Sequence, residues 1–479
     1  MKPGVERWAA IAFALLCVAT LVGTLVYPTY PNYDSYYSLL WGREIVHGHL
    51  PHFEGFRLPT EHPLAILAGV ILQPFGHSAD RVWIVAILAS YLALVAGVYR
   101  VGRLAFTPLV GAVAAVLVLS RFDFGFLAAR GYIDIPYLAL IVWAVALEAA
   151  RPRRGAPVFA LLALAGLLRP EAWLLSGLYF LWMSWKATWP ERAKWLAWAA
   201  IAPVGWCLVD GIVTGDPLFS LHYTSDSAEV LGRAKTLGEL PAAIPAFLAD
   251  IVKPPVLIAA LAGLFASVLL VPKRVVWPGL LLLSGIGTFV AIGIAGLSII
   301  ERYLVVAALA VLIFAAVAVG GWTLLEPGTR LRRVWAGAAT AGVVFVVVLT
   351  ALHLDLGHFD NELTFRGDAH VALSKILDTP AVRRDLRCGP LTVPNHKLVP
   401  DSRWLADLPF ERVWARAQVA SKAYPERPQR KGVQLFVLGR FAIFKQAYTN
   451  DLDPATIELP PAGWRLVART AYYAAYARC

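Results

Sequence analysis

The stretch YPNYDSYYSLLWGREIVHGHLPHFEGFRLPTEHPL, residues Tyr30–Leu64, is polar, aromatic and rich in ionisable groups. It closely follows an apolar run, Trp8–Tyr27, which is long enough to cross a bilayer as a helix. The stretch itself is too polar to cross, because its ionisable side chains would have to leave water. These side chains are Asp34, Arg43, Glu44, Glu54, Arg57, Glu61, His47, His49, His52 and His62. The pattern predicts a membrane helix that opens into a loop at one face of the membrane.

The composition indicates that this first span is one of many. The 479 residues are 58% hydrophobic and 16% charged, with a mean hydropathy of +0.62, whereas soluble domains carry about 25% charged residues. Apolar runs of about 18 or more residues recur over the first three quarters of the chain. The runs are continuous and do not alternate, which favours helices over a barrel. We therefore expect a polytopic α-helical membrane protein with about 11 transmembrane helices.

Basic residues set the expected topology. Lys and Arg gather between the expected spans at positions 100–103, 151–154, 186–194, 273–274 and 330–333. All of these clusters fall on one side of the membrane when the spans are counted in order. Because basic loops stay in the cytoplasm, we expect a multi-pass plasma-membrane protein with a cytoplasmic N-terminus. The expected outer loops are 28–80, 121–135 and 214–254. This topology explains the net charge of +11, so lipids and not nucleic acid are the expected partners of the basic residues.

The segments around the first loop have distinct expected roles. Ser35–Val46 has the pattern of a short amphipathic helix lying on the membrane. Pro63–Phe75 is apolar but shorter than the roughly 20 residues that a span requires, so we expect a re-entrant or juxtamembrane segment. The first span has no clear small-residue cleavage site, and we expect it to remain as an anchor.

The composition changes after the last expected span. Residues 1–353 form the expected transmembrane domain, and residues 354–479 form an expected extracytoplasmic soluble domain of the α/β or α+β class. The expected strands are Leu391–Val393, Val433–Leu438 and Trp464–Thr470, and the expected helices are Ala369–Leu377 and Leu408–Ala420. Cys388 and Cys479 lie in this domain, and we expect a disulfide between them if the domain faces an oxidising compartment.

Asp34 and Asp134 are the acids whose setting favours catalysis. Asp34 follows the first span among aromatic residues, where a partly dehydrated carboxyl is placed to act as a general base. Asp134, in RGYIDIP, stands at the outer mouth of a span, where carboxylates are costly and tend to be functional. Each acid is also explained as a helix N-cap. Arg130 is near enough in sequence to pair with Asp134.

Two other motifs place charges at the outer ends of expected spans. Arg169 and Glu171, in LLRPEAW, form either a structural ion pair or the lining of a polar pocket. Arg302, in IIERYLVV, is placed either to bind a lipid phosphate or to extend toward the headgroups.

The histidines are weaker candidates. His62 stands where the first loop returns to the membrane, and His222 and Asp226, in LHYTSD, are pocket candidates in the loop 214–254. The spacing of His47, His49 and His52 is a poor metal signature, so no metal is expected. No P-loop or Rossmann motif stands in a suitable context, and ATP-driven transport therefore has no support.

Five motifs in this order resemble the GT-C superfamily of membrane glycosyltransferases. They are Asp34 after the first span, His62-Pro63-Leu64 at the end of the loop, Asp134-x-Pro136, Arg169-Pro170-Glu171, and Arg302-Tyr303-Leu304. Together they cover residues 1–325, and they look most like the branch of protein O-mannosyltransferases and lipid A aminoarabinose transferases. Some actinobacterial arabinofuranosyl- and mannosyltransferases of this superfamily also end in an outer soluble domain.

The resemblance implies a GT-C-like fold and an inverting glycosyltransferase. The implied donor is a sugar on a polyprenyl monophosphate, and the acceptor is a cell-wall glycan, a glycolipid or a protein. Asp34 is the implied general base, and Asp134 is expected to orient the acceptor or a basic side chain. The donor phosphate is assigned to Arg302, with Arg57 or Arg169 in reserve. Substrate-binding roles fall to Glu61, His62, Glu171, His222 and Tyr303. No cofactor or obligatory metal is implied.

The chain also departs from the family pattern. The acid pair usual in the first loop is here Asp34–Ser35, and the usual HPP is His62-Pro63-Leu64, which leaves the sugar and the acceptor open. Two other classes of function remain as alternatives. A transporter or lipid flippase would show inverted repeats and charges near the membrane midplane. A non-catalytic assembly protein would use its outer domain to bind cell-wall glycan.

Overall fold

The computed structural model describes residues 3–230, 238, 240–297, 299–353, 356–420, 426, 428–438, 460 and 462–479. The chain divides into two compact units, and each is discontinuous in sequence. Unit 1 comprises Met1–Val22, His62–Leu64 and Ala86–Asp355, and unit 2 comprises Gly23–Glu61, Ala65–Val85 and Leu356–Cys479. Most of the first loop therefore shares a unit with the C-terminal region.

Apolar helices make the chain a membrane protein. Among the described residues, six helices are long and apolar enough to cross a membrane, or up to eight if each of two bent pairs is one span. The bent pairs are Pro108–Leu119 with Phe122–Ala129, and Leu240–Val252 with Pro254–Leu270. Ala156–Leu168 and Ala172–Ser184 are apolar but shorter. The count of about 11 spans therefore stays a prediction.

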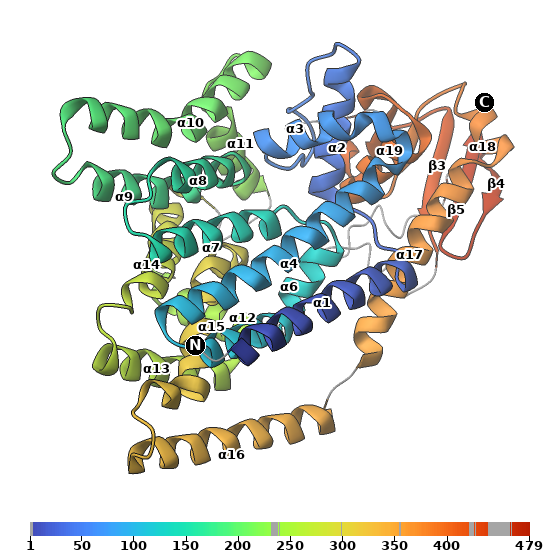
Figure 1. Ribbon diagram of the computed structural model, residues 1–479. Helices are drawn as coiled ribbons and strands as arrows, with labels where there is room; N and C mark the ends of the chain where they lie inside the picture. The colour runs from blue at the N-terminus through green and yellow to red at the C-terminus, as the bar shows by residue number, and fades with distance from the viewer. Residues whose placement is uncertain are drawn as a thin grey trace. The chain divides into compact units, whose positions relative to one another are not determined.

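Unit 1 is built almost entirely from helices (Figure 1). They are α1 (Pro3–Val26), α4 (Ala79–Ala105), α5 (Pro108–Leu119), α6 (Phe122–Ala129), α7 (Asp134–Ala150), α8 (Ala156–Leu168), α9 (Ala172–Ser184), α10 (Trp189–Thr214), α11 (Phe219–Val230), α12 (Leu240–Val252), α13 (Pro254–Leu270), α14 (Val276–Ile294), η3 (Glu301–Leu304), α15 (Val305–Gly320), η4 (Gly321–Leu324) and α16 (Arg330–His353). The end of α1 from Gly23 and the start of α4 up to Val85 belong to unit 2. The expected outer loop 121–135 thus contains a helix, α6.

Helix α15 is the buried centre of unit 1, and small residues let its neighbours approach closely. A Cβ added to Gly263 of α13 would lie on the carbonyl oxygen of Phe314, and one added to Gly285 of α14 would lie 2.5 Å from the backbone nitrogen of Ala307. Close backbone contact of this kind is how helices associate in lipid, where burial of apolar surface gives little driving force. The packing fixes the start of α15, and with it the short helix η3.

Unit 2 combines the first loop with a five-stranded sheet (Figure 1). Its helices are α2 (Tyr33–Val46), α3 (Pro63–Leu72), η1 (Gln73–Ser78), α17 (Leu356–Leu377), α18 (Pro380–Asp385), η5 (His396–Leu398), α19 (Val399–Ala406), η6 (Phe410–Arg412) and η7 (Arg416–Ala420). Its strands are β1 (Leu391–Val393), β2 (Val413–Ala415), β3 (Gly432–Val437), β4 (Arg465–Arg469) and β5 (Tyr473–Arg478).

The sheet has the order β2-β1-β3-β5-β4. Strand β1 pairs in parallel with β2 and β3, and β5 pairs antiparallel with β3 and β4. The expected α/β or α+β class of the C-terminal region is confirmed, and three expected strands coincide with β1, β3 and β4. The expected helix Leu408–Ala420 is wrong, because Val413–Ala415 pairs with β1 as a strand between two short 3₁₀ helices.

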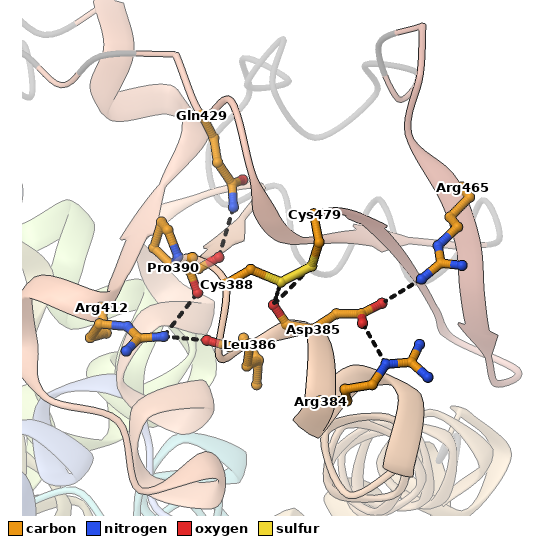
Figure 2. The surroundings of a disulfide bond; sticks show 10 residues. Arg384, Asp385, Leu386, Cys388, Pro390, Arg412, Gln429, Arg465 and Cys479 are labelled. Carbon is orange, nitrogen blue, oxygen red and sulfur yellow. Dashed lines mark hydrogen bonds and ion pairs between the residues drawn. A yellow bond between two sulfur atoms is a disulfide. The ribbon is translucent and has the colours of Figure 1, made fainter.

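A disulfide joins Cys388, just after α18, to Cys479 at the end of β5, as expected (Figure 2). The two Cα atoms are 5.8 Å apart and 91 residues apart in sequence. Beside it, the carboxylate of Asp385 accepts hydrogen bonds from Arg384 Nε at 2.9 Å and Arg465 Nη2 at 3.4 Å. The hydrogen bond from Arg384 is the main cause that lowers the pKa of Asp385. These contacts tie strands β4 and β5 to α18.

Helices α2 and α3 cross at two glycines within unit 2. A Cβ on Gly42 would lie 2.4 Å from the carbonyl carbon of Gly69, and one on Gly69 would lie 2.3 Å from the carbonyl oxygen of Ser38. Helix α2 is buried from Ser35 to Gly42, so the amphipathic helix expected to lie on the membrane is instead largely enclosed. The expected re-entrant segment Pro63–Phe75 corresponds to α3 and the start of η1.

Candidate active site

Three segments of unit 1 bring charged side chains together. Asp134 is the first residue of α7, and Arg302 lies in η3 before α15. Arg169 and Glu171 lie in the turn between α8 and α9. Pro170 between them has no backbone N–H and cannot continue helix α8, so the chain turns there and presents both charged side chains.

Arg169 joins the two acids. Its side chain is buried, its Nη1 donates to Asp134 Oδ1, and its Nε and Nη2 donate to Glu171 Oε1 at 2.9 and 2.5 Å. Two carboxylates therefore balance one buried guanidinium, and each of its nitrogens donates to a carboxylate. The N-cap explanation of Asp134 is wrong, because Ile133 is the cap residue of α7.

Asp134 and Glu171 each have one carboxylate oxygen that accepts no hydrogen bond from the described residues. Asp134 is 1% exposed, and the Glu171 side chain is 9% exposed. Within the part of the chain that the structure describes, Asp134 Oδ2 and Glu171 Oε2 are buried and accept no hydrogen bond. A buried carboxylate oxygen without a donor is costly, so these atoms are suited to the hydroxyl or amino groups of a bound ligand.

Arg302 adds a second cation to Asp134. Its Nε lies 3.6 Å from Asp134 Oδ1, and its side chain is 34% exposed. Arg169, by contrast, has a side chain that is only 6% exposed. Of the two guanidiniums, the one on η3 is therefore the more accessible to a ligand.

His62 belongs to the same cluster. Its ring packs edge-on against Trp206 of α10 at 5.8 Å and hydrogen bonds to the backbone of Leu168. Burial, followed by the guanidiniums of Arg169 and Arg302, lowers the pKa of His62 to about 3, so the ring is neutral. Its Nδ1 is a buried atom without a hydrogen-bond partner among the described residues and is a third available acceptor.

Aromatic rings surround the cations. The guanidinium carbon of Arg169 lies 5.7 Å from the centre of the Tyr137 ring and 5.4 Å from that of Tyr303. The guanidinium carbon of Arg302 lies 5.9 Å from the centre of the Tyr132 ring. Sequence reasoning selected Tyr303 but missed Tyr132 and Tyr137. Their position on either side of Asp134 in GYIDIPY was the signal that could have identified them.

Asp34 is placed in unit 2, in the first turn of α2. The side chain of Asn32 caps this helix by accepting from the backbone N–H of Ser35 at 3.1 Å. The N-cap explanation of Asp34 is therefore wrong. The neighbouring Tyr33 donates its hydroxyl to the carbonyl of Arg57, so the two sequence-predicted residues Asp34 and Arg57 lie on segments that are in contact.

The other predicted residues fall in several places. Glu61 is buried in unit 2. His222 Nδ1 of α11 and Asp216 Oδ2 form a hydrogen bond at 2.6 Å, and both side chains are exposed. His52 bridges Glu44 at 3.3 Å and Glu411 at 3.2 Å within unit 2. Among the described residues, no group of three His, Cys, Asp or Glu side chains is arranged to hold a metal ion.

Each unit therefore collects its own subset of the predicted residues. Unit 1 brings together Asp134, Arg169, Glu171, Arg302, His62 and Tyr303, which we call the Asp134 cluster. Unit 2 holds Asp34, Arg57 and Glu61. The cluster combines an accessible cation with three acceptor atoms that have no partner among the residues the structure describes. This combination suits an anionic ligand that also carries hydroxyl or amino groups.

Comparison with known proteins identifies the fold. No protein-family model matches the chain, and no curated protein matches it in sequence. The structure of ArnT from Cupriavidus metallidurans bound to undecaprenyl phosphate is similar, with a TM-score of 0.56, 12% identity and 98% of each chain covered. The apo state of ArnT gives a TM-score of 0.56 at 15% identity, again with 98% of each chain covered.

The archaeal oligosaccharyltransferase AglB from Archaeoglobus fulgidus, in complex with an inhibitory peptide and a dolichol-phosphate, is also similar. Its TM-score is 0.50 at 13% identity, and the match covers 86% of this chain and 64% of that chain. The likeness to both proteins extends through the helices and into the C-terminal region. The chain therefore has the GT-C fold that its motifs resemble.

Proposed function

We propose that the protein is an inverting membrane glycosyltransferase that takes its sugar from a polyprenyl monophosphate. The acceptor is a hydroxyl of an extracytoplasmic glycan, glycolipid or protein. The ArnT structure holds undecaprenyl phosphate and the AglB structure holds a dolichol-phosphate, which supports a lipid phosphate as the carrier here. The observation that carries the proposal is the Asp134 cluster, with its accessible guanidinium and unused acceptors.

Arg302 is the proposed ligand of the donor phosphate. The nitrogens of Arg169 already donate to Asp134 and Glu171, so Arg169 serves to position those acids. Arg57 lies in unit 2 and remains the reserve. A fixed cation stabilises the leaving phosphate most when it is held in place before the reaction, and the Asp134 carboxylate provides that support for Arg302.

Asp34 is the proposed general base. The acceptor hydroxyl gives its proton to the Asp34 carboxylate as its oxygen forms a bond to the anomeric carbon. The bond from that carbon to the phosphate oxygen breaks, and the electron pair leaves with the polyprenyl phosphate. A positioned base contributes roughly 10²–10⁴-fold to such a step.

The unused acceptors are the proposed contacts of the sugar. Asp134 Oδ2, Glu171 Oε2 and His62 Nδ1 would each accept a hydrogen bond from a sugar hydroxyl or amino group. A neutral His62 is suited to this role, because its lone pair remains available at every physiological pH. Tyr303, Glu61 and His222 are proposed further substrate contacts.

The reaction is proposed to occur on the extracytoplasmic face of the plasma membrane, with the N-terminus in the cytoplasm. The disulfide between Cys388 and Cys479 supports this orientation, because such bonds persist in oxidising compartments. The basic clusters between the helices support it through the positive-inside rule.

Donor binding by Arg302→Ala tests the phosphate assignment. Native mass spectrometry of the purified protein with undecaprenyl phosphate should show retention reduced by roughly 10- to 100-fold, because an interaction with a charged group is lost. Arg302→Lys should retain part of the binding. The matched control is Arg332→Ala, since Arg332 also covers an aromatic ring, Trp322, and donates to a carbonyl, that of Leu325. Equal retention by Arg302→Ala and the control would overturn the assignment.

A transfer assay separates the enzyme from the other classes of function. Protein in vesicles would be supplied with labelled polyprenyl-phosphate sugars and candidate acceptors, and the label would be followed into the acceptor. Movement of the lipid across the bilayer without transfer would indicate a flippase. Glycan binding without transfer would indicate an assembly protein.

A further inference from the structure

The candidate base Asp34 lies on a helix that the C-terminal region contacts directly. Helix α2 packs against α19, and both belong to unit 2. Asp34 is in the first turn of α2, and Arg43 and Glu44 are near its end. The position of Asp34 therefore depends on what holds this helix.

Two arginines, Arg43 of α2 and Arg403 of α19, hold the end of α2, because each donates hydrogen bonds to the other segment. Arg403 of α19 donates from Nη2 to Glu44 Oε1 at 2.7 Å, across 359 residues of sequence. Arg43 donates from Nη2 to the carbonyl of Arg403 at 3.2 Å and from Nη1 to Asp407 Oδ1 at 2.9 Å. The second Glu44 oxygen accepts from the backbone N–H of His52 at 3.0 Å. Both oxygens of Glu44 are thus occupied.

Arg403 is an unusual residue to bury. It is 1% exposed, and its guanidinium carbon lies 5.3 Å from the centre of the Phe410 ring. Within the described residues, its Nε and Nη1 have no hydrogen-bond partner, and Glu44 is the carboxylate paired with it. A buried charge with one carboxylate adds little net stability, but it strongly disfavours any arrangement that separates the pair.

The beginning of α2 is held by stacked rings. Tyr30, just before the helix, stacks on His370 of α17 with ring centres 3.4 Å apart. Arg81 covers the Tyr30 ring at 3.8 Å. Tyr33, the neighbour of Asp34, meets His396 edge-on at 5.5 Å. Residues of the C-terminal region therefore contact α2 or its approach at both ends.

We infer that the C-terminal region positions the catalytic base, and that Arg403 is a positioning residue acting through Glu44. The inference rests on the proposed role of Asp34. It gives the C-terminal region a part in the reaction that requires no ligand of its own, because Glu44 and Asp34 lie on the same helix, α2. Displacing a catalytic group by about 1 Å costs roughly 10²-fold in rate, so a modest shift of α2 is enough to be measured.

Arg403→Met and Glu44→Gln test the inference singly and together. Methionine fills much of the space of the arginine stem without its charge. Each single variant should lower kcat roughly 10- to 100-fold, with little change in the donor KM, and should speed hydrogen exchange in residues 33–46. The double variant removes both charges, so its Tm should recover relative to Glu44→Gln, while its kcat should stay low because the contact between Glu44 and Arg403 is still missing from the end of the helix.

If the Glu44–Arg403 pair only stabilises the fold, kcat per folded molecule of the double variant should recover together with Tm. The matched control is Glu362→Gln, which removes the buried carboxylate partner of Arg366 inside α17. This control should lower Tm without changing kcat per folded molecule. Wild-type kcat and hydrogen exchange in Arg403→Met would overturn the inference.

Asp34→Asn, measured in the same series, separates this inference from the proposed function. If Asp34→Asn keeps normal transfer, the base assignment fails, and the positioning of a base by Arg403 fails with it. If Asp34→Asn is inactive while Arg403→Met keeps wild-type kcat, the base assignment stands and only the positioning role fails.

Discussion

In unit 1, Arg169 is held by two carboxylates, whereas in unit 2 Arg403 is held by one. The pairing around Arg169 uses its donors and leaves Asp134 Oδ2 and Glu171 Oε2 without partners among the described residues. The pairing around Arg403 uses both oxygens of Glu44 and leaves two nitrogens of the arginine, Nε and Nη1, without a partner in the described part of the chain.

The difference in exposure completes the contrast. The Asp134 cluster includes a guanidinium, Arg302, whose side chain is 34% exposed, while Arg403 is 1% exposed. A ligand can reach the first arrangement but not the second. Similar buried ion pairs are therefore suited to different roles: the Asp134 cluster to binding a substrate, and the Glu44–Arg403 pair to fixing a helix.

Among variants of the Asp134 cluster, Asp134→Asn should give the largest effect, because it removes the charge that Arg169 and Arg302 share. Transfer should fall roughly 10²–10³-fold, as measured by initial rates with saturating acceptor. Glu171→Gln removes the other partner of Arg169 but leaves Arg302 with its carboxylate, so its loss should be smaller. Equal losses in the two variants would contradict the special role of Asp134.

Removing the disulfide should affect unit 2 alone. Replacing Cys388 and Cys479 by serine should destabilise this unit by about 2–4 kcal/mol, because the bond closes a long loop. Thermal unfolding with and without reductant would measure it, and donor binding at low temperature should be unchanged. A Tm insensitive to reductant would show that the bond does not hold β5 in place.

Gly42→Ala should disturb the packing of α2 against α3 without changing a charged residue. The new methyl would meet the backbone of Gly69, and overpacking of this kind costs about 1–3 kcal/mol. Gly177→Ala in α9 is the matched control, because a methyl at that position would have no described atom within 4 Å outside its own helical neighbourhood. Denaturation of both variants, followed by circular dichroism, should show a loss only for Gly42→Ala.

Acidification should weaken unit 2 through His370. Burial, and then Arg81, lower the pKa of His370 to about 3, below the unfolded value of about 6.5. The unfolded state therefore binds the extra proton, and stability is complete above pH 6.5 and falls as the pH drops toward 3. Between pH 7.5 and 6 the loss should be about 1 kcal/mol.

His370→Phe keeps an aromatic ring beside Tyr30 and removes the titrating group. The Tm of this variant should therefore change less than that of the wild type over the same pH range. Identical pH profiles for the two proteins would show that His370 is not the responsible group.

Each residue of the Asp134 cluster was selected from the sequence as a candidate site residue. That these residues lie together was not predicted. Asp134, Arg169 and Arg302 were identifiable because each charge stands at the end of an apolar run. Their pairing was not, since contacts between separate helices depend on packing and leave no local pattern. Arg130, the nearest cation in sequence, was the natural candidate, yet Arg169 donates to Asp134.

The Glu44–Arg403 pair was not predicted from the sequence. A separation of 359 residues gives no periodicity or spacing to read, and both residues look like ordinary surface charges. Strand β5 was also not predicted from the sequence, because it forms through contacts with other segments of the chain. Tyr473–Arg478 is rich in alanine, and it forms a strand because β3 and β4 pair with it on both sides.

The most direct test of the account is transfer by Asp34→Asn in vesicles supplied with polyprenyl-phosphate sugars. Asparagine keeps the size of the side chain and cannot accept the proton, so transfer should fall roughly 10²–10⁴-fold while donor retention is unchanged. Asp378→Asn, an exposed aspartate paired with Arg383, is the matched control and should transfer normally. Near-normal transfer by folded Asp34→Asn protein would contradict the assignment of Asp34 as the general base.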